Sequence, residues 1–190
     1  LIHADYSQIE LRLLAHFSGC KELVDAYKNG EDIHALTASQ VFGVPLSKVD
    51  PHMRSAAKAV NFGIIYGISD FGLASNLNIS TKQAREYIQA YFAHYSDVKQ
   101  YMDSNVAFAR KNGYVTTLLG RKRVINEIRS SNFNIRSFGE RAAMNMPLQG
   151  SSADIIKIAM VNIFERFQKE KIRSKLILQV HDELVIDAFE

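Results

Sequence analysis

Two aspartates, Asp5 and Asp182, each stand where a short apolar run of the sequence ends. Asp182 follows His181 between the runs LILQV and ELVID, and a tight turn there exposes its carboxylate at the end of a sheet. Turn formation alone also explains Asp182, as strand termination or helix entry explains Asp5. If the carboxylates converge, they form an oxygen site that suits Mg²⁺, with room for two ions about 3.5–4 Å apart. Glu183 adds a third carboxylate, which strand alternation directs away from Asp182.

Cations and aromatic rings share one stripe of a helix expected to begin at Pro51. Arg54 and Lys58 lie one turn apart, where like charges repel by a few tenths of a kcal/mol unless an anion binds between them. Phe62 and Tyr66 continue the same four-residue spacing. This row fits a nucleoside triphosphate, whose phosphates would meet the cations while its sugar and base meet the rings. A basic surface patch beside core aromatics is the structural alternative.

Glu10 has both a structural and a functional interpretation. The segment SQIE at 7–10 has the pattern of a capping box at a helix start, which alone accounts for Glu10. Its position shortly after Asp5 also places it near any sugar bound at the metal site.

A third set of polar residues recurs every four positions: Arg141, Asn145 and Gln149. This spacing suits contacts with phosphates and with the minor-groove edges of bases. Pro147 interrupts the pattern, so we expect the helix to stop there and Gln149 to lie just beyond its end.

The elements that position these residues are mostly helices. The sequence predicts a strand at 1–5 and another pair at 175–180 and 183–188, joined by His181-Asp182. A small hairpin with a basic tip is predicted at 114–125. The predicted helices begin near Ile9, Asp32, Pro51, Ser80, Ser96, Arg136 and Ser151. The fold class is therefore helix-rich α+β. Because an isolated hairpin is marginal in water, the terminal strands should pair into one sheet, which brings Asp5 near Asp182.

The amino-acid composition and the distribution of charge restrict the class of protein further. The 190 residues are 47% hydrophobic and 23% charged, which is typical of a folded protein and excludes a disordered or collagen-like chain. Residues 51–150 hold 13 basic and 6 acidic side chains, whereas the two ends are slightly acidic, so the middle is the expected polyanion-binding section. A single cysteine and the lack of a leader or a long apolar run predict a soluble cytoplasmic protein that does not enter a membrane.

Three segments resemble motifs of the family A DNA polymerases. DYSQIELR at 5–12 is similar to the first polymerase motif of that family, RSAAKAVNFGIIYG at 54–67 to the second, and QVHDELV at 179–185 to the third. The motifs occur in the family's order. The stretches between them, including 30–43 and 140–157, also resemble the family, so the similarity covers the whole chain.

The resemblance implies a catalytic centre. Asp5 and Asp182 would bind two Mg²⁺ ions together with the backbone carbonyl of Tyr6, and Glu183 would belong to the same catalytic set. Lys58 would also supply a proton to the leaving pyrophosphate.

The resemblance also implies how nucleotide and DNA are held. The residues beside the incoming deoxynucleoside triphosphate would be Tyr6, Gln8, Glu10, His34, Arg54, Lys58, Phe62 and Tyr66. Glu10 would exclude the ribose 2′-hydroxyl, and phenylalanine at position 62 implies discrimination against nucleotides that lack a 3′-hydroxyl. The residues that contact primer-template DNA would be Arg141, Asn145, Gln149 and His181, with His181 at the primer end.

The family's right-hand polymerase fold implies a division of the chain. Residues 1–50 would form the first part of the palm with an incomplete antiparallel sheet, 51–135 the helical fingers, and 136–190 the second part of the palm. The thumb, any exonuclease domain and the end of the palm would lie outside it. The expected activity is DNA-templated DNA synthesis in replication and repair by a monomeric parent protein. The alternatives are a non-catalytic DNA-binding fragment and a two-metal cyclase or nuclease; Glu10 and the row from Arg54 to Tyr66 favour the polymerase.

Overall fold

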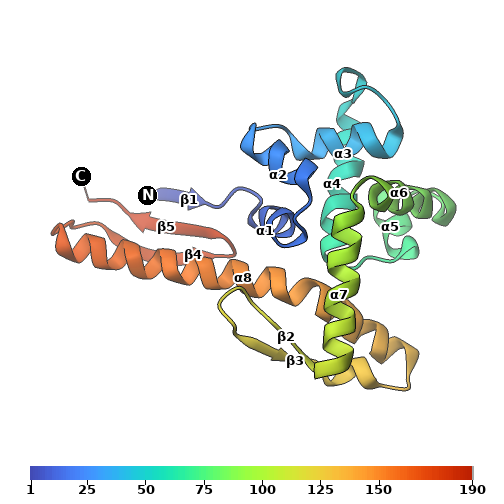
Figure 1. Ribbon diagram of the computed structural model, residues 1–190. Coiled ribbons are helices and arrows are strands. Elements are labelled where there is room, and N and C mark those ends of the chain that lie inside the picture. Colours follow the sequence, from blue (N-terminus) through green and yellow to red (C-terminus); the bar gives the residue numbers. More distant parts are fainter. Residues whose placement is uncertain (190) are drawn as a thin grey trace.

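In the computed structural model, which describes residues 1–189, a small sheet and a cluster of helices lie along one long helix (Figure 1). The strands are β1 (Ile2–Asp5), β2 (Tyr114–Thr116), β3 (Lys122–Val124), β4 (Lys175–Val180) and β5 (Glu183–Asp187). The helices are α1 (Ile9–Ser18), α2 (Lys21–Lys28), α3 (Ile33–Phe42), α4 (Pro51–Ile65), α5 (Asp70–Leu77), α6 (Thr81–His94), α7 (Ser96–Asn112) and α8 (Phe133–Lys169), with short 3₁₀ turns at Leu46–Lys48 (η1) and Asn126–Arg129 (η2). This is the helix-rich α+β fold that the sequence predicts.

The predicted terminal sheet is present. Its strand order is β1-β5-β4 and both pairings are antiparallel, so the first strand of the chain pairs with the last. Both chain ends lie at the same end of this sheet, and α8 runs along it (Figure 1). The second sheet is the predicted hairpin, β2 with β3.

Local capping explains where several helices begin. Asp50 accepts a hydrogen bond from the Met53 amide, with Pro51 in the first turn of α4, as predicted. Ser80 and Gln83 form the predicted capping box at the start of α6.

Helices α2 and α5, at 21–28 and 70–77, were not predicted. Because α2 has no side-chain cap and follows α1 after two residues, the sequence carries little boundary signal there.

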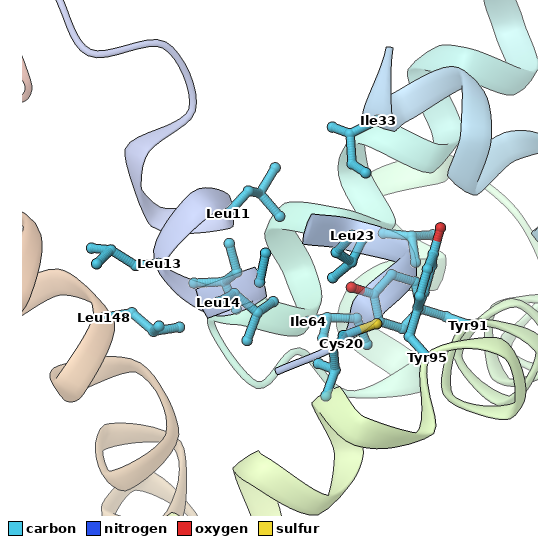
Figure 2. Packing of buried hydrophobic residues seen from close by; sticks show 14 of the residues in the cluster. Leu11, Leu13, Leu14, Cys20, Leu23, Ile33, Ile64, Tyr91, Tyr95 and Leu148 are labelled. Atoms are coloured by element: carbon cyan, nitrogen blue, oxygen red, sulfur yellow. The ribbon is translucent and has the colours of Figure 1, made fainter. Parts of the chain in front are cut away.

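The main core joins α1 to the helices around it. The apolar face of α1 contributes Leu11 and Leu14, which are almost completely buried, and α2 adds Leu23. Figure 2 shows Leu14 between Leu148 of α8 and Ile64 of α4, and Leu23 further on, towards Tyr95. Burying side chains of this size stabilises the fold by about 1.5–3 kcal/mol each. The core thereby fixes α1, α4 and α8 relative to one another, and these are the helices that carry most of the predicted site.

The prediction that a helix ends at Pro147 is wrong. Helix α8 continues from 133 to 169 with Pro147 buried inside it. A proline removes one backbone donor, but α8 packs against η2 and α7 through Gly139 and Glu140, before the proline, and its later part runs along β4 (Figure 1), so packing supports the helix along its length. Gly139 allows the approach to η2, since a Cβ atom there would lie 2.6 Å from the Ile128 amide nitrogen.

Ser151 connects the β2–β3 hairpin to α8 beside the proline. Its hydroxyl donates to the Pro147 carbonyl at 2.5 Å and accepts from the Leu118 amide at 2.8 Å. Arg121 of the hairpin adds an ion pair with the buried Asp154 at 2.8 Å and a hydrogen bond to the Gly150 carbonyl.

Among residues 1–189, no helix has both the length and the apolar character needed to cross a membrane.

We expect Ser151→Ala to lower the free energy of unfolding by about 1 kcal/mol or more, because it leaves the Leu118 amide without its acceptor. Urea unfolding measures this change. The control is Ser152→Ala, a neighbouring buried serine that makes neither contact; equal losses for the two variants would contradict the bridging role of Ser151.

Candidate active site at the β1–β5 strand ends

The strand ends that carry Asp5 and Asp182 are neighbours. Strand β1 pairs with β5 so that Asp5 lies opposite Glu183. The Tyr6 amide then donates to the Asp182 carbonyl at 3.2 Å, which extends the pairing by one bond. His181 has a φ of 54°, the left-handed conformation of a tight turn between β4 and β5. The backbone therefore brings the two aspartate-bearing segments together, as the sequence predicts.

Glu183 has a side-chain partner of its own. Its carboxylate contacts the Nδ1 atom of His3, which lies two residues before Asp5 on β1. His3 was not predicted as part of the site. Its position two residues from Asp5 on a strand, and hence on the same face, is the only sequence signal that could have indicated it.

An open cleft of about 630 Å³ lies beside the Asp182 turn. Seven predicted site residues line it: Gln8, Glu10, Phe62, Tyr66, Gln149, His181 and Asp182. The lining residues that were not predicted are Ile9, Ser152, Ala153, Ile156 and Gln179. Ser152 and Ile156 follow Gln149 at helical spacing along α8, so recognising a continuous helix would have identified them. Asp5 and Tyr6 do not line the cleft and are exposed beside it.

Glu10 is held by Tyr66, not by a cap. The capping-box interpretation is wrong, because the residue before α1 is Gln8 in a left-handed conformation without a side-chain cap. The Tyr66 hydroxyl instead donates to the Glu10 carboxylate at 2.9 Å, linking α4 to α1. Burial raises the pKa of Glu10, the Tyr66 hydrogen bond lowers it, and the charge of Asp182 raises it, with a net increase. Burial and the Glu10 contact raise the pKa of Tyr66 to about 12, so this hydroxyl remains a donor.

The cation and aromatic row lies along α4 as predicted. Arg54 and Lys58 are exposed, Phe62 is half-buried, and Tyr66 borders the cleft. Arg54 has a partner that was not predicted, since its Nε atom donates to Asp32 at 2.6 Å. Asp32 was expected only as the first residue of a helix, and it is instead the N-cap of α3, where it accepts from two backbone amides.

His34 is buried at the junction of α3 and α4. It is 3% exposed, and its ring lies 5.9 Å from that of Phe62. Burial lowers the pKa of His34, Asp32 raises it, and the charges of Arg54 and Lys58 lower it, with a net decrease. His34 is therefore a neutral imidazole at pH 7.

Arg141, Asn145 and Gln149 all lie on α8, so the prediction that Gln149 sits beyond the helix is wrong. Gln149 lines the first cleft, whereas Arg141 lines a second hollow of about 520 Å³, which shares Phe62 and Tyr66 with the first. Arg141 packs against Gly67, where a Cβ atom would lie 2.9 Å from its Cγ. Asn145 borders neither hollow.

The donor set at the strand ends fits a hard cation. Two aspartates and a backbone carbonyl offer only oxygen atoms, the ligands that Mg²⁺ takes together with water and phosphate oxygens.

A second possible metal site lies away from the strand ends. Within residues 1–189, the one group of three His, Cys, Asp or Glu side chains close enough to share an ion is Cys20, Glu22 and Asp97. Burial raises the pKa of the Cys20 thiol to about 11, which keeps it protonated and a poor metal ligand.

Comparison with known proteins agrees with this geometry. The sequence profile of DNA polymerase family A matches residues 1–190. The chain is 57% identical to DNA polymerase I of Caldicellulosiruptor bescii, with 99% of the chain covered, and 56% identical to DNA polymerase I of Geobacillus stearothermophilus, with 97% covered. It spans 22% and 21% of the length of these relatives. The chain belongs to DNA polymerase family A.

The fold of this chain also matches a solved structure. The POL domain of Pol1 from M. smegmatis, in complex with DNA primer-template and dNTP, matches with a TM-score of 0.94 at 46% identity. The match covers 99% of this chain and 33% of that one.

Tyr66→Phe should raise the pKa of Glu10 further, because the variant lacks the hydroxyl that stabilises the carboxylate. A ¹³C carboxyl NMR titration, with the signal assigned by Glu10→Gln, measures the shift. Tyr27→Phe is the matched control, since Tyr27 donates to the neighbouring Gln8 at 3.0 Å and not to Glu10.

The raised pKa of Glu10 determines how its contribution to the free energy of unfolding changes with pH. A group whose pKa is higher in the folded than in the unfolded chain contributes stability that is full below its unfolded pKa, near 4.5, and is lost as pH rises through the folded value. The Tyr66→Phe variant should therefore lose this contribution over a window that extends to higher pH. An unchanged window would contradict the assigned role of the Tyr66 hydrogen bond.

Proposed function

We propose that this chain is the palm and fingers part of a DNA polymerase that adds deoxynucleotides to a primer under the direction of a template. In the reaction the primer 3′-hydroxyl attacks the α-phosphate, the bond to the β-phosphate breaks, and pyrophosphate leaves. The observation that carries the proposal is the Tyr6–Asp182 backbone bond, which joins the segments of Asp5 and Asp182 beside a cleft bordered by Phe62 and Tyr66 of the α4 row.

The proposed division assigns the three-stranded sheet to the palm and helices α4 to α7 to the fingers. Residues 1–50 and 136–190 would form the palm, since they supply β1, β4, β5 and the helix that runs along this sheet. Residues 51–135 would form the fingers, which contain α4 to α7 and the β2–β3 hairpin.

Asp5, Asp182 and the Tyr6 carbonyl would hold the two Mg²⁺ ions. When bound, these ions would make the primer hydroxyl a better nucleophile and stabilise the charge on the leaving pyrophosphate. Glu183 lies opposite Asp5 and would support the site while in contact with His3.

The α4 row would bind the incoming nucleotide. Arg54 and Lys58 present two positive charges one turn apart, which suits a triphosphate, and Lys58 would give a proton to the departing pyrophosphate. Phe62 and Tyr66 would pack against the sugar and the base at the mouth of the cleft. Gln8 and Tyr6 would border the same nucleotide from the start of α1.

Glu10 would act as the sugar selector. The hydrogen bond from Tyr66 fixes its carboxylate in the cleft, so the side chain occupies a defined volume that a ribose 2′-hydroxyl would need.

The DNA contacts would come from α8 and the β4–β5 turn. Arg141, Asn145 and Gln149 follow one another at four-residue spacing on a continuous helix, which can track a strand of the duplex. His181, in the turn next to Asp182, would place the primer end.

Asp5→Asn and Asp182→Asn should each reduce primer extension in the presence of Mg²⁺ by a factor of about 10³ or more, because the amide replaces a charged metal ligand. Single-nucleotide extension of a labelled primer-template measures this loss. Asp187→Asn, at the far end of β5, is the control and should leave extension within about twofold of the parent.

A gel-shift measurement on the same proteins tests the alternative of a non-catalytic DNA-binding fragment. Binding of primer-template by the 190-residue chain without any extension would support that alternative for the fragment. Normal extension by Asp182→Asn would contradict the proposed catalytic centre.

Glu10→Ala should lower the preference for deoxynucleotides over ribonucleotides by about tenfold or more, because it opens the space beside the sugar. Glu10→Gln keeps the volume and should retain most of the preference. Incorporation of dNTP and rNTP opposite the same template base measures the ratio. If Glu10→Gln lost selectivity as completely as Glu10→Ala, charge and not volume would be responsible.

A further inference from the structure

A buried polar network joins α3 to α4 behind the exposed cations of the α4 row. Asn61 and Thr37 are fully buried and His34 nearly so. An uncharged amide is unusual on the buried face of α4, where its neighbours Val60 and Ile64 belong to the apolar core. A buried polar side chain at such a position has to be hydrogen-bonded, which makes its partners informative.

The amide of Asn61 determines which nitrogen of His34 carries the proton. Its Nδ2 atom lies 3.1 Å from Nδ1 of His34, and an amide nitrogen can only donate. Nδ1 of the neutral ring therefore accepts, and the proton resides on Nε2. Thr37 lies on the other side of the same amide, with its hydroxyl 3.1 Å from both the Oδ1 and the Nδ2 atoms of Asn61.

On the other edge of the His34 ring, the Nε2 atom keeps a small exposed area. Within residues 1–189, Nε2 of His34 makes no hydrogen bond and is not among the buried polar atoms that lack a partner, so solvent reaches it. The charged groups around the ring are Asp32, Arg54 and Lys58. The ring thus offers a neutral N–H donor next to the two cations of the row.

We propose that Asn61 is a positioning residue, which fixes the tautomer and orientation of His34 so that its Nε2–H donates to a phosphate oxygen of the incoming nucleoside triphosphate. This inference rests on the proposed function. Without the Asn61 amide, the ring could carry its proton on either nitrogen and rotate, and the fraction of molecules with a donor facing the phosphates would fall.

The first test is single-turnover incorporation by the full polymerase chain that contains these residues. Asn61→Leu, which has a similar volume and no donor, should raise the Kd for dNTP about tenfold with little change in the maximal rate. Thr37→Val removes an equally buried hydrogen bond from the same amide without touching His34, and should change the Kd less than about twofold. A loss as large for Thr37→Val would show a general packing effect and overturn the proposal.

A double-mutant cycle separates this inference from the proposed function. His34→Ala should itself raise the Kd, and adding Asn61→Leu to it should have no further effect, because Asn61 acts through the ring. Additive effects would overturn the role of Asn61 while leaving the polymerase assignment intact. A parent chain that incorporates no nucleotide would contradict the proposed function instead.

Asn61→Asp supplies a second variant of unchanged shape. Its carboxylate can only accept, so it draws the ring proton to Nδ1 and raises the pKa of His34. As pH rises through this raised pKa, the imidazolium, which still donates from Nε2, would give way to a neutral ring that cannot. The Kd for dNTP should therefore rise with pH in this variant and stay nearly constant in the parent. Parallel pH profiles would overturn the proposal.

Discussion

The antiparallel pairing of β1 with β5 is the constraint on which the site depends. It is short, and its register matters because side chains alternate between the two faces of a sheet: a slip of one residue would turn Asp5 to the opposite face. The extra bond from Tyr6 to the Asp182 carbonyl ends the pairing at the turn, where two oxygen-bearing side chains emerge from neighbouring backbones. Helix α8 supports this sheet and also lines the cleft, so the same packing that stabilises the strands places Gln149 beside them.

Helix α4 is held in two different ways along its two faces. Its buried face packs into the core through Val60 and Ile64, and this apolar contact supplies most of the stability. Its site face is held by polar contacts with other helices, such as Arg54 with Asp32 and Tyr66 with Glu10. An exposed ion pair such as Arg54 with Asp32 contributes about 0–1 kcal/mol to stability. A polyanionic ligand can therefore replace the Arg54 pair at low cost without disturbing the core.

The sequence was sufficient for features that local chemistry or strong motifs determine. The Asp50-Pro51 start of α4, the Ser80 capping box and the strand ends at Asp5 and Asp182 all follow from a few neighbouring residues. It was insufficient where tertiary packing overrides local preference. Pro147 lies inside α8 because contacts on both sides hold the helix, a fact that no local pattern contains. The predicted capping box before α1 is absent, and Glu10 instead accepts a hydrogen bond from Tyr66 at the end of another helix, a partner distant in the sequence.

The same distinction applies to the residues of the site. The row from Arg54 to Tyr66 was found because it carries charge and rings at regular spacing, and residues such as His34 were found only through the family resemblance. Asn61 and Asp32 were missed, although they lie in segments that resemble the family, because their partners are distant in the sequence. The structure also separates charge along α4, with Arg54 and Lys58 towards its beginning and the carboxylates of Glu10 and Asp182 at the cleft beside its end. A bound triphosphate would lie between these groups. Its phosphates would neutralise the cations. Cations bound at the strand ends would relieve the repulsion by Asp182 that adds to the effect of burial on the pKa of Glu10, so each component would favour binding of the other.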